Sequence, residues 1–323
     1  MLSFAWRAMA RRTPPPARPS ARARVSVIVP LYNHARFVVD AVRSALAQGP
    51  VLREVVVVDD GSTDNSAETL LAACGGDPRL VFWSQPNRGA HAAINAGLMR
   101  ATGEVLTILN SDDIYASGRL DRLVGVLDAE PGVDLVATGL RFIDADGSSV
   151  SNAWYGEALR SLDALGDLGT ALVNGNFVMS TSNLAFRRGL LERTGLFAPL
   201  RYAHDLDFML RALALGHRFT VLTGEALLSY RLHATNTIKE DHRAVRLEWA
   251  AVAAAYLDAL LAAPGPVDWA RLQAIGAVLE RHALLRGVQL CLAHLRRNPA
   301  GATLERSRLL GDGGFLAALQ DCV

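Results

Sequence analysis

The sequence predicts an α/β protein, in which a mostly parallel sheet is flanked by helices and is followed by a helical C-terminal extension. Three observations support this fold class. Short apolar runs alternate with segments of helical spacing over residues 25–115, and strands that are apolar on both faces are typical of parallel sheets covered by helices. The runs end in polar residues, as strands do at the ligand-binding edge of such a sheet. From residue 241 the chain becomes rich in alanine and leucine with helical periodicity.

The N-terminal elements follow these apolar runs in order. Strands are predicted at residues 25–30, 54–58, 79–83 and 105–109. Helices are predicted between them, at residues 35–47, 67–73 and 90–100. Gly49 and Pro50 end the first of these helices. The alternation predicts a doubly wound architecture of the kind that binds nucleotides.

The second half of the chain has a less regular pattern. A strand is predicted at residues 133–140, a turn at 144–147, a helix at 206–215, and short strands at 221–222 and 226–230. Residues 150–180 mix glycine, asparagine and aromatic residues without a clear period, which predicts loops around a cleft. Beyond residue 241 we expect helices, with a break at 264–266 and a helical stretch over 272–297.

The composition excludes several classes of protein. The chain has 323 residues, of which 50% are hydrophobic and 20% charged, and this is typical of a globular protein. Its formal net charge of +1 gives no overall field that would attract nucleic acid. Three cysteines lie far apart, at positions 74, 291 and 322, which favours a reducing compartment over a disulfide framework or a thiolate zinc site. We therefore expect a cytoplasmic protein without a nucleic-acid partner.

Residues 1–24 differ from the rest of the chain. They contain six arginines, no acidic residue and the run Pro14-Pro15-Pro16, which predicts a flexible basic arm. An unstructured tail, a weak contact with an anionic membrane surface and a transit peptide all fit this composition. Since no window of the sequence has the ~18 consecutive apolar residues of a membrane span, any membrane contact is expected to be peripheral, on the inner face of the cell membrane.

Two adjacent carboxylates follow the fourth predicted strand, where Asn110, Asp112 and Asp113 end the apolar run. Like charges side by side repel each other, and a divalent cation would relieve this repulsion. Carboxylate oxygens suit Mg²⁺ or Mn²⁺. A solvated turn that ends the strand and caps the next helix explains the same residues. Both interpretations stay open on this motif alone.

The other predicted strands also end in groups suited to a nucleotide. Carboxylates at strand ends accept hydrogen bonds from ribose or base in dinucleotide-binding folds. Neither a glycine-rich P-loop nor a GxGxxG motif accompanies them, which argues against a kinase, a GTPase or a dinucleotide oxidoreductase. A metal must then neutralise the phosphates. These strand-end residues are Pro30, Tyr32 and Asn33, then Asp59 and Asp60, and then Asn87, Gly89 and Asn95.

Seven segments resemble, in the family's order, those of family 2 glycosyltransferases, which have the Rossmann-like GT-A fold. Seven matches in order are far more specific than any one of them. The resemblance implies a GT-A domain at residues 25–237, preceded by the basic arm at 1–24 and followed by the helical extension at 238–323. The segments are residues 25–33, 57–66, 87–97, 101–113, 181–197, 204–211 and 230–237.

The resemblance implies an inverting, metal-dependent transfer of one sugar from a nucleotide diphosphate sugar, with a UDP-sugar favoured. The acceptor would be a hydroxyl of a glycan, a lipid-linked sugar or a small molecule, in the synthesis of an envelope polysaccharide, glycan or glycolipid. Arg231 is in the last matched segment, where it could pair with phosphate oxygens. The candidate nucleotide-sugar-binding residues are Pro30, Tyr32, Asn33, Asp59, Asp60, Asn87, Gly89, Asn95, Asn110, Asp112 and Arg231.

The resemblance also assigns the metal and the catalytic base. Asp112 and Asp113 lie in the family's DxD region, which has asparagine at its first position here, and with His233 they are the candidate ligands of Mg²⁺ or Mn²⁺. Asp205 matches the general base of the family's Glu-Asp pair, and His204 stands where the glutamate usually is. Two plainer interpretations stay open: Asp205 also suits a helix cap, and His233 suits an ordinary loop histidine.

Two rival functions also fit a nucleotide-binding fold. A nucleotidyltransferase on a related fold would need a lysine-rich loop for its triphosphate, and Lys239 is the only lysine of the chain. A non-catalytic nucleotide-sugar-binding or scaffold protein would explain His204 as a sign of lost activity. A carboxylate base and a metal-binding acid pair in one chain favour the transferase.

Overall fold

A mixed sheet of nine strands forms the centre of the part of the chain that the structure describes. The computed structural model describes residues 23–234, 236–237, 240–297 and 312–322. The strands are β1 (Val25–Leu31), β2 (Leu52–Asp59), β3 (Leu80–Ser84), β4 (Val105–Ile108), β5 (Ile114–Tyr115), β6 (Val133–Ile143), β7 (Ser149–Val150), β8 (Ala185–Arg187) and β9 (Arg218–Arg231). Their order in the sheet is β3-β2-β1-β4-β8-β6-β9-β5, and β7 pairs with β6.

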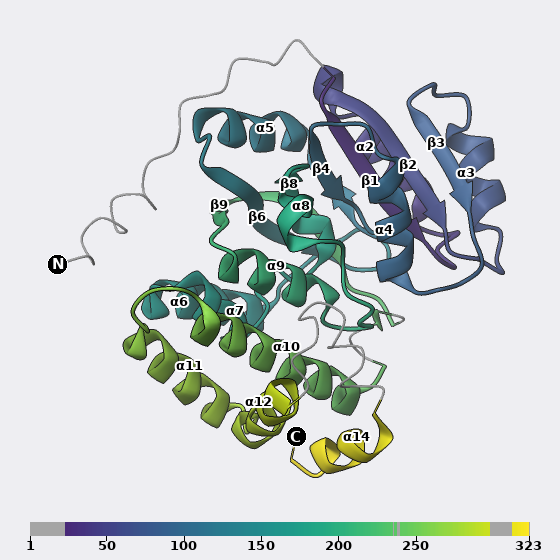
Figure 1. Cartoon of the computed structure of the whole chain (residues 1–323). Helices are drawn as coiled ribbons and strands as arrows, with labels where there is room; N and C mark the ends of the chain where they lie inside the picture. Colours follow the sequence, from purple (N-terminus) through teal and green to yellow (C-terminus); the bar gives the residue numbers. More distant parts are fainter. Residues whose placement is uncertain (1–22, 235, 238–239, 298–311, 323) are drawn as a thin grey trace.

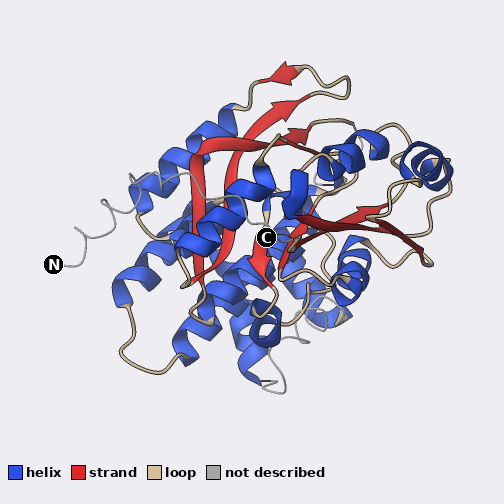
Figure 2. Cartoon of the chain, turned by 90° about the horizontal axis from the view of Figure 1, so that it is seen from above, coloured by secondary structure: helices blue, strands red, loops and turns tan. Residues whose placement is uncertain are grey.

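Helices cover both faces of this sheet, and several of them form a separate group below it in Figure 1. Figure 2, viewed from above, shows helices on either side of the strands. The helices of the sheet half are α2 (Val38–Leu46), α3 (Ser66–Cys74), α4 (Ala90–Arg100), α5 (Arg119–Ala129), α8 (Leu190–Thr194) and α9 (His204–Ala214). The lower group is α6 (Ala153–Leu165), α7 (Leu168–Asn174), α10 (His242–Ala262), α11 (Trp269–Arg281), α12 (Leu285–Arg297) and α14 (Gly313–Gln320).

The predicted parallel half of the sheet is confirmed. β1 pairs in parallel with β2 on one side and with β4 on the other, and β2 pairs in parallel with β3. Ile28 of β1 lies opposite Val56 and Ile108, and every residue of β1 and β4 is buried. Helices on both faces leave no polar side to these strands, which is why the sequence shows continuous apolar runs there.

The other half of the sheet is mixed. β8 lies antiparallel between β4 and β6, β5 lies antiparallel on β9, and β6 and β9 are parallel. β9 is one strand where two short strands were predicted. Its pairing with β6 moves from Leu222 directly to Ala226, so that residues 223–225 form a bulge. A Cβ on Gly139 of β6 would lie 2.7 Å from the carbonyl oxygen of Thr223, so only glycine leaves room for the bulge.

The loops predicted over residues 150–180 are wrong in part, because α6 and α7 occupy much of this stretch. Each helix begins at a polar cap: Asn152 accepts a hydrogen bond from the N–H of Tyr155, and Asp167 accepts one from the N–H of Thr170. The buried face of α6 includes Tyr155 and Leu162. Glycines and polar caps within a short stretch masked this apolar spacing in the sequence.

The predicted C-terminal helices are confirmed, with the break at 264–266 between α10 and α11. The predicted stretch 272–297 is divided into α11 and α12, and Ala283 between them has a φ of 53°. These helices share one hydrophobic core with the sheet half, in which Phe208 of α9, Ala251 of α10 and Ile275 of α11 are buried together. The C-terminal extension therefore packs directly on the helix that bears Asp205.

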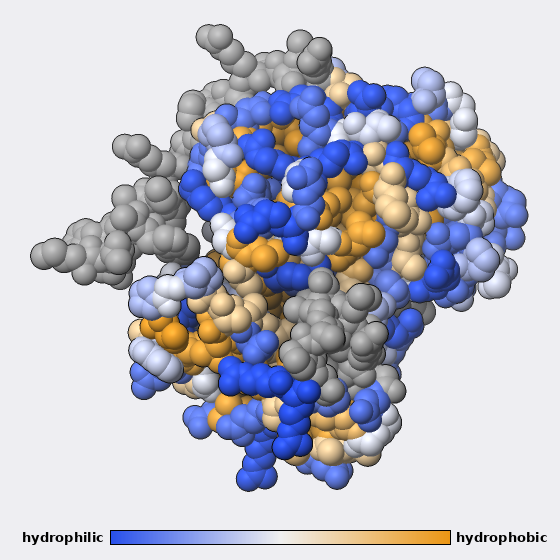
Figure 3. All heavy atoms as spheres, viewed as in Figure 1, coloured by the Kyte–Doolittle hydropathy of each residue, from blue (hydrophilic) through white to orange (hydrophobic). Residues whose placement is uncertain are grey.

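The predicted basic arm lies almost wholly outside the described residues, which begin at position 23. Arg24, which the prediction included in the arm, pairs with Glu104 at 2.8 Å and with Asp128 at 2.9 Å, and so contacts the domain. Among the described residues, no helix is long and apolar enough to cross a membrane. Figure 3 shows hydrophilic and hydrophobic residues mixed over the face that it presents.

The packing of α4 on β1 depends on Gly97, because a Cβ at this position would collide with Ile28. We expect Gly97→Ala to lower the free energy of unfolding by about 1–3 kcal/mol, measured by urea denaturation. Gly276 of α11 is the matched control, since it is also helical and has no atom near its Cβ position. Gly276→Ala should leave stability unchanged or raise it by up to about 1 kcal/mol. Equal stability of the two variants would contradict a close α4–β1 contact.

Candidate active site

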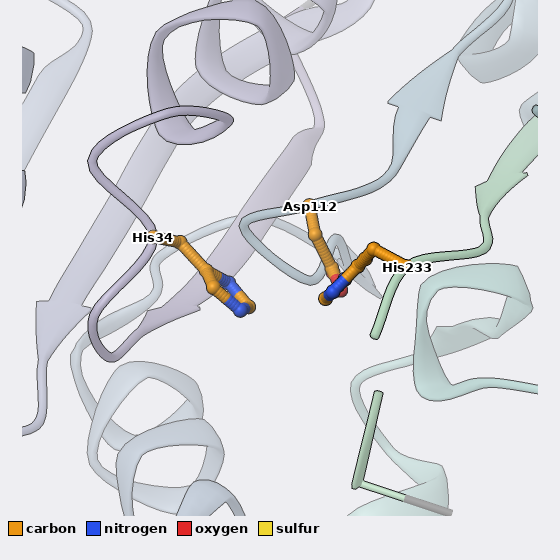
Figure 4. A group of neighbouring side chains, drawn as sticks. All are labelled: His34, Asp112 and His233. Carbon is orange, nitrogen blue, oxygen red and sulfur yellow. The ribbon is translucent and has the colours of Figure 1, made fainter. Parts of the chain in front are cut away.

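Three side chains meet where the parallel strands β1 and β4 and the end of β9 come to the same edge of the sheet. They are His34, Asp112 and His233, and one potential ligand atom from each lies within 4.8 Å of the other two. Figure 4 shows the two imidazoles and the carboxylate facing one another. The Nε2 atom of His233 is 2.9 Å from Oδ2 of Asp112. Two imidazole nitrogens and one carboxylate oxygen form a donor set suited to a divalent metal ion.

His34 is a member of this cluster that the sequence analysis did not assign. Its backbone N–H donates to Oγ of Ser66 at 2.9 Å, and its Nδ1 lies 2.7 Å from Oγ of Ser111, so the backbone and the imidazole each have a hydrogen-bond partner. Burial lowers the pKa of His34, which favours the neutral imidazole that binds metals. The available signal was its position directly after the first strand, next to residues already suspected of donor binding.

The two adjacent acids have separate roles in the structure. Burial alone would raise the pKa of Asp112, but the hydrogen bond with His233 and the nearby imidazoles bring it below its usual value. Asp113 is not part of the cluster: its carboxylate accepts from Oγ of Ser182 at 2.6 Å and from the N–H of Arg231 at 3.0 Å. Burial and the charge of Asp112 raise the pKa of Asp113 to about 8. Asp113 therefore joins segments of the chain, while Asp112 belongs to the cluster.

Asn110 is occupied by the turn that follows α7. Its Nδ2 donates to Oγ of Ser180 at 3.0 Å, its Oδ1 accepts from Oγ1 of Thr181 at 3.0 Å, and its N–H donates to Oγ of Ser182 at 2.8 Å. The amide thus fixes the 180–182 turn against the end of β4. A carboxylate could not donate to Ser180 in this way, which gives a structural reason for asparagine at this position.

Asp59 and Asp60 organise the loops at the end of β2. Asp60, 2% exposed, accepts from Nε2 of Gln85 at 2.8 Å and from the backbone N–H groups of Arg88 and Gly89 at 3.0 and 2.8 Å. Asp59 accepts from the N–H of Ser62 at 3.2 Å and from Oγ of Ser84 at 3.0 Å. These carboxylates hold the loop after β3, which includes the exposed Asn87.

The residues after β1 form an exposed rim beside these loops. Tyr32 is 46% exposed, whereas Pro30 is buried within the strand. Asn33 has a φ of 51°, and its Oδ1 accepts from the N–H of Thr63 at 2.8 Å. Tyr32 and Asn33 are thus accessible to a ligand, while Pro30 shapes the strand end.

Arg231 and Asn95 make internal contacts. The Nε atom of Arg231 donates to the carbonyl oxygen of Asp112 at 2.8 Å, and its guanidinium lies 4.9 Å from the centre of the Phe37 ring. Asn95 exchanges two hydrogen bonds with the backbone of Phe197, at 2.9 and 3.0 Å. These contacts indicate that both side chains support the site's framework.

Asp205 lies in the first turn of α9, and it is 6% exposed. Its Oδ2 accepts from Nδ2 of Asn176 at 2.7 Å, and its Oδ1 accepts from the N–H of Leu206 at 2.7 Å. Asn176 is a second residue that the sequence analysis missed, because it follows a helix that was not predicted. Asp207, two residues further on, pairs with Arg211 on the same helix at 2.5 Å.

Tyr230 is a partly buried side chain that lies within electrostatic range of Asp205 and of the acid pair. Burial raises the pKa of the Tyr230 phenol, and nearby carboxylates raise it further. These carboxylates belong to Asp113, Asp112 and Asp205. The negative charges of Asp112, Asp113 and Asp205 therefore act on the same side chain, although Asp205 comes from a different part of the chain than the acid pair.

His204, which stands in place of the usual glutamate, also begins α9. Its ring centre lies 6.2 Å from that of Phe197, and in the described part of the chain its buried Nδ1 has no hydrogen-bond partner. The imidazole thus packs against the loop before α9, while Asp205 alone supplies a carboxylate at this position.

Comparison with known sequences agrees with this arrangement. Residues 26–195 match the glycosyl transferase family 2 domain. The succinoglycan biosynthesis proteins ExoO and ExoU of Rhizobium meliloti are 34% and 32% identical over 74% and 69% of this chain. An uncharacterized glycosyltransferase of Nostoc, alr2836, is 33% identical over 66% of it. Each match spans 66% of the relative's own length.

Solved structures show the same fold. Staphylococcus aureus TarS in complex with UDP-GlcNAc has a TM-score of 0.62 at 20% identity, over 92% of this chain and 89% of that one. The mannosyltransferase PcManGT of Pyrobaculum calidifontis, in complex with GDP-Man and Mn²⁺, has a TM-score of 0.60 at 24% identity, over 98% and 87%. The architecture is therefore the GT-A fold. This chain belongs to glycosyl transferase family 2.

The contacts of Asp60 predict a specific loss of stability. Asp60→Asn leaves one side-chain oxygen where two now accept three N–H groups, so we expect the free energy of unfolding to fall by about 1–3 kcal/mol in urea denaturation. Asp146 is the control, because its ion pair with Arg36 is exposed. Asp146→Asn should change stability by no more than about 1 kcal/mol. A loss no larger for Asp60→Asn than for the control would contradict its bracing role.

Proposed function

We propose that this chain is an inverting, metal-dependent glycosyltransferase that moves a sugar from a nucleotide diphosphate sugar to an acceptor hydroxyl. The observation that carries the proposal is the cluster of His34, Asp112 and His233 at the edge of the sheet, together with the separate buried carboxylate of Asp205. An inverting displacement needs charge stabilisation on the leaving diphosphate and a base at the acceptor. The two sets of groups meet these two needs.

The donor is proposed to be a UDP-sugar, and the role in the cell to be polysaccharide, glycan or glycolipid synthesis. In support, the TarS structures hold UDP or UDP-GlcNAc, and the PcManGT structure holds GDP-Man. ExoO and ExoU are named for succinoglycan biosynthesis. We assign the nucleoside to the loops after β1, β2 and β3, where Tyr32 and Asn87 are exposed and Asp60 holds the backbone of the third loop.

Mg²⁺ or Mn²⁺ is the proposed cofactor, with His34, Asp112 and His233 as ligands. This set replaces Asp113 of the sequence prediction with His34, because the Asp113 carboxylate is turned toward Ser182 and β9. A bound divalent ion would neutralise the charge that develops on the leaving diphosphate. Magnesium prefers oxygen ligands, so a set with two imidazoles favours Mn²⁺.

The residues of the chain supply the other steps. Asp205 takes the proton of the acceptor hydroxyl as the acceptor oxygen bonds to the anomeric carbon of the donor sugar. The bond between that carbon and the diphosphate oxygen breaks at the same time, and the nucleoside diphosphate leaves with the electron pair. Asn176, which donates to Asp205, holds the carboxylate in one orientation. No protein nucleophile is required.

A non-catalytic donor-binding protein is the second candidate function. The specific observation in its favour is His204, an imidazole where the family usually has a glutamate. Asp205 retains its carboxylate and an ordered partner in Asn176, which favours catalysis. Donor binding without turnover for UDP-glucose, UDP-galactose, UDP-N-acetylglucosamine and GDP-mannose would support the non-catalytic function.

The metal assignment predicts which histidines matter. His34→Ala and His233→Ala should each weaken Mn²⁺ binding in the presence of UDP by about tenfold or more, measured by isothermal titration calorimetry. The wild type should bind Mn²⁺ more tightly than Mg²⁺. His242→Ala, which changes an exposed histidine at the start of α10, is the control and should bind like the wild type. Unchanged affinity in His34→Ala would remove His34 from the ligand set.

The base assignment predicts a loss of turnover with donor binding retained. Asp205→Asn should lower kcat by about 10²- to 10⁴-fold, because the amide cannot take the proton. Since the amide oxygen can still accept from Asn176, donor affinity should remain unchanged. Transfer or hydrolysis of the four donors with Mn²⁺ measures kcat, and Asp163→Asn on the exposed face of α6 is the control. Full activity in Asp205→Asn would show that another group is the base.

A further inference from the structure

We propose that α10, in the C-terminal extension, positions the catalytic base, and that Glu248 and Trp249 are its positioning residues. The inference rests on the proposed function, because it takes Asp205 as the base. Neither residue is in the segments that resemble the family, which end at residue 237. Each of them holds one of the two chain segments that meet at Asp205. Glu248 binds residues 201–203, which precede Asp205, and Trp249 binds the end of α7, which precedes Asn176.

Glu248 holds the segment that leads into Asp205. Its side chain is 8% exposed, and its Oε1 accepts from the backbone N–H of Arg201 at 2.8 Å. Its Oε2 accepts from the N–H groups of Tyr202 and Ala203 at 2.7 and 2.9 Å. Ala203 is the N-terminal cap residue of α9 and provides no side-chain cap. A carboxylate from another helix therefore holds the three residues that lead into α9, and its charge suits the positive end of the α9 dipole.

Trp249, the next residue of α10, holds the other segment. Its Nε1 donates to the carbonyl oxygen of Val173 at 3.0 Å, in the last turn of α7. The chain then leaves the helix and reaches Asn176, whose amide donates to Asp205. His282, at the end of α11, packs against the Trp249 ring, with 4.9 Å between the ring centres. Its Nε2 lies 3.2 Å from Oδ1 of Asn174, the last residue of α7. Two helices of the extension thus hold the chain just before Asn176.

These contacts restrict Asp205 from both sides. The backbone before it is bonded to Glu248, and the partner of its Oδ2 follows a helix end that is bonded to Trp249. Packing alone would not need a buried carboxylate, which is costly unless its oxygens are hydrogen-bonded. A small displacement of a catalytic group lowers the rate strongly. Movement of α10 should therefore disturb the base and leave the donor side unaffected, since His34 and Asp112 lie on other elements.

Two variants remove the two contacts. Glu248→Gln keeps the size of the side chain but leaves one oxygen for three N–H groups, and Trp249→Phe keeps an aromatic ring without the N–H donor. We expect each to lower kcat by about 10- to 100-fold with unchanged donor KM and unchanged stoichiometry of UDP binding. Asp258→Asn, on the same helix in an exposed ion pair with Arg296, is the matched control and should keep the wild-type kcat.

A measurement of kcat per UDP-binding site separates a loss of positioning from a loss of folded protein. Expressing kcat per UDP-binding site removes any fraction of the protein that has not folded, and Trp249→Phe serves as the second test if Glu248→Gln does not fold. In the double variant Glu248→Gln/Asp205→Asn, the loss should be no larger than in Asp205→Asn alone, because Glu248 acts through Asp205. Losses that multiply, or a wild-type kcat per site in the single variants, would overturn the proposal.

The two proposals fail in different ways. If the wild type turns over none of the four donors, or if Asp205→Asn is fully active, the proposed function fails. If Asp205→Asn is inactive while Glu248→Gln and Trp249→Phe keep the wild-type kcat per site, the proposed function stands and the positioning role of α10 fails.

Discussion

The buried carboxylate of Asp113 is the contact on which the arrangement of the site depends. It accepts from the hydroxyl of Ser182 and from the backbone N–H of Arg231, so that it joins the loop after β4 to the 180–182 turn and to the end of β9. With Asp113 held in this way, the neighbouring Asp112 faces His233. One acid thus fixes the framework, and the other remains at the edge of the sheet, where a metal and a diphosphate would bind.

The site draws its groups from segments far apart in the chain. The cluster of His34, Asp112 and His233 comes from the ends of β1, β4 and β9. The candidate base lies in the first turn of α9, where it is bonded to Asn176 after α7 and preceded by a segment bonded to α10. A parallel sheet brings strand ends together at one edge, which explains the donor side. The candidate base is held instead by helices, and for this reason we propose a role in the chemistry for the C-terminal extension, which also shares the hydrophobic core.

Sequence patterns predicted what depends on local periodicity. The parallel strands were visible because both of their faces are buried, and Asp112, His233 and Asp205 were visible because they belong to recognised segments. β8, with three residues, is too short to show a period. Glu248 was invisible for another reason: it binds backbone N–H groups 45 to 47 residues away, and no local pattern marks such a side chain. His34 directly follows the strand-end residues Tyr32 and Asn33, but only the folded structure shows that Asp112 and His233 lie beside it.

The position of the metal tests this account most directly. Crystals grown with UDP and MnCl₂ allow the ion to be located by anomalous diffraction near the manganese absorption edge. The account predicts one strong peak among His34, Asp112 and His233, beside the diphosphate, with the Asp113 carboxylate still on Ser182. A peak bound by Asp113, or one located away from the two histidines, would contradict it.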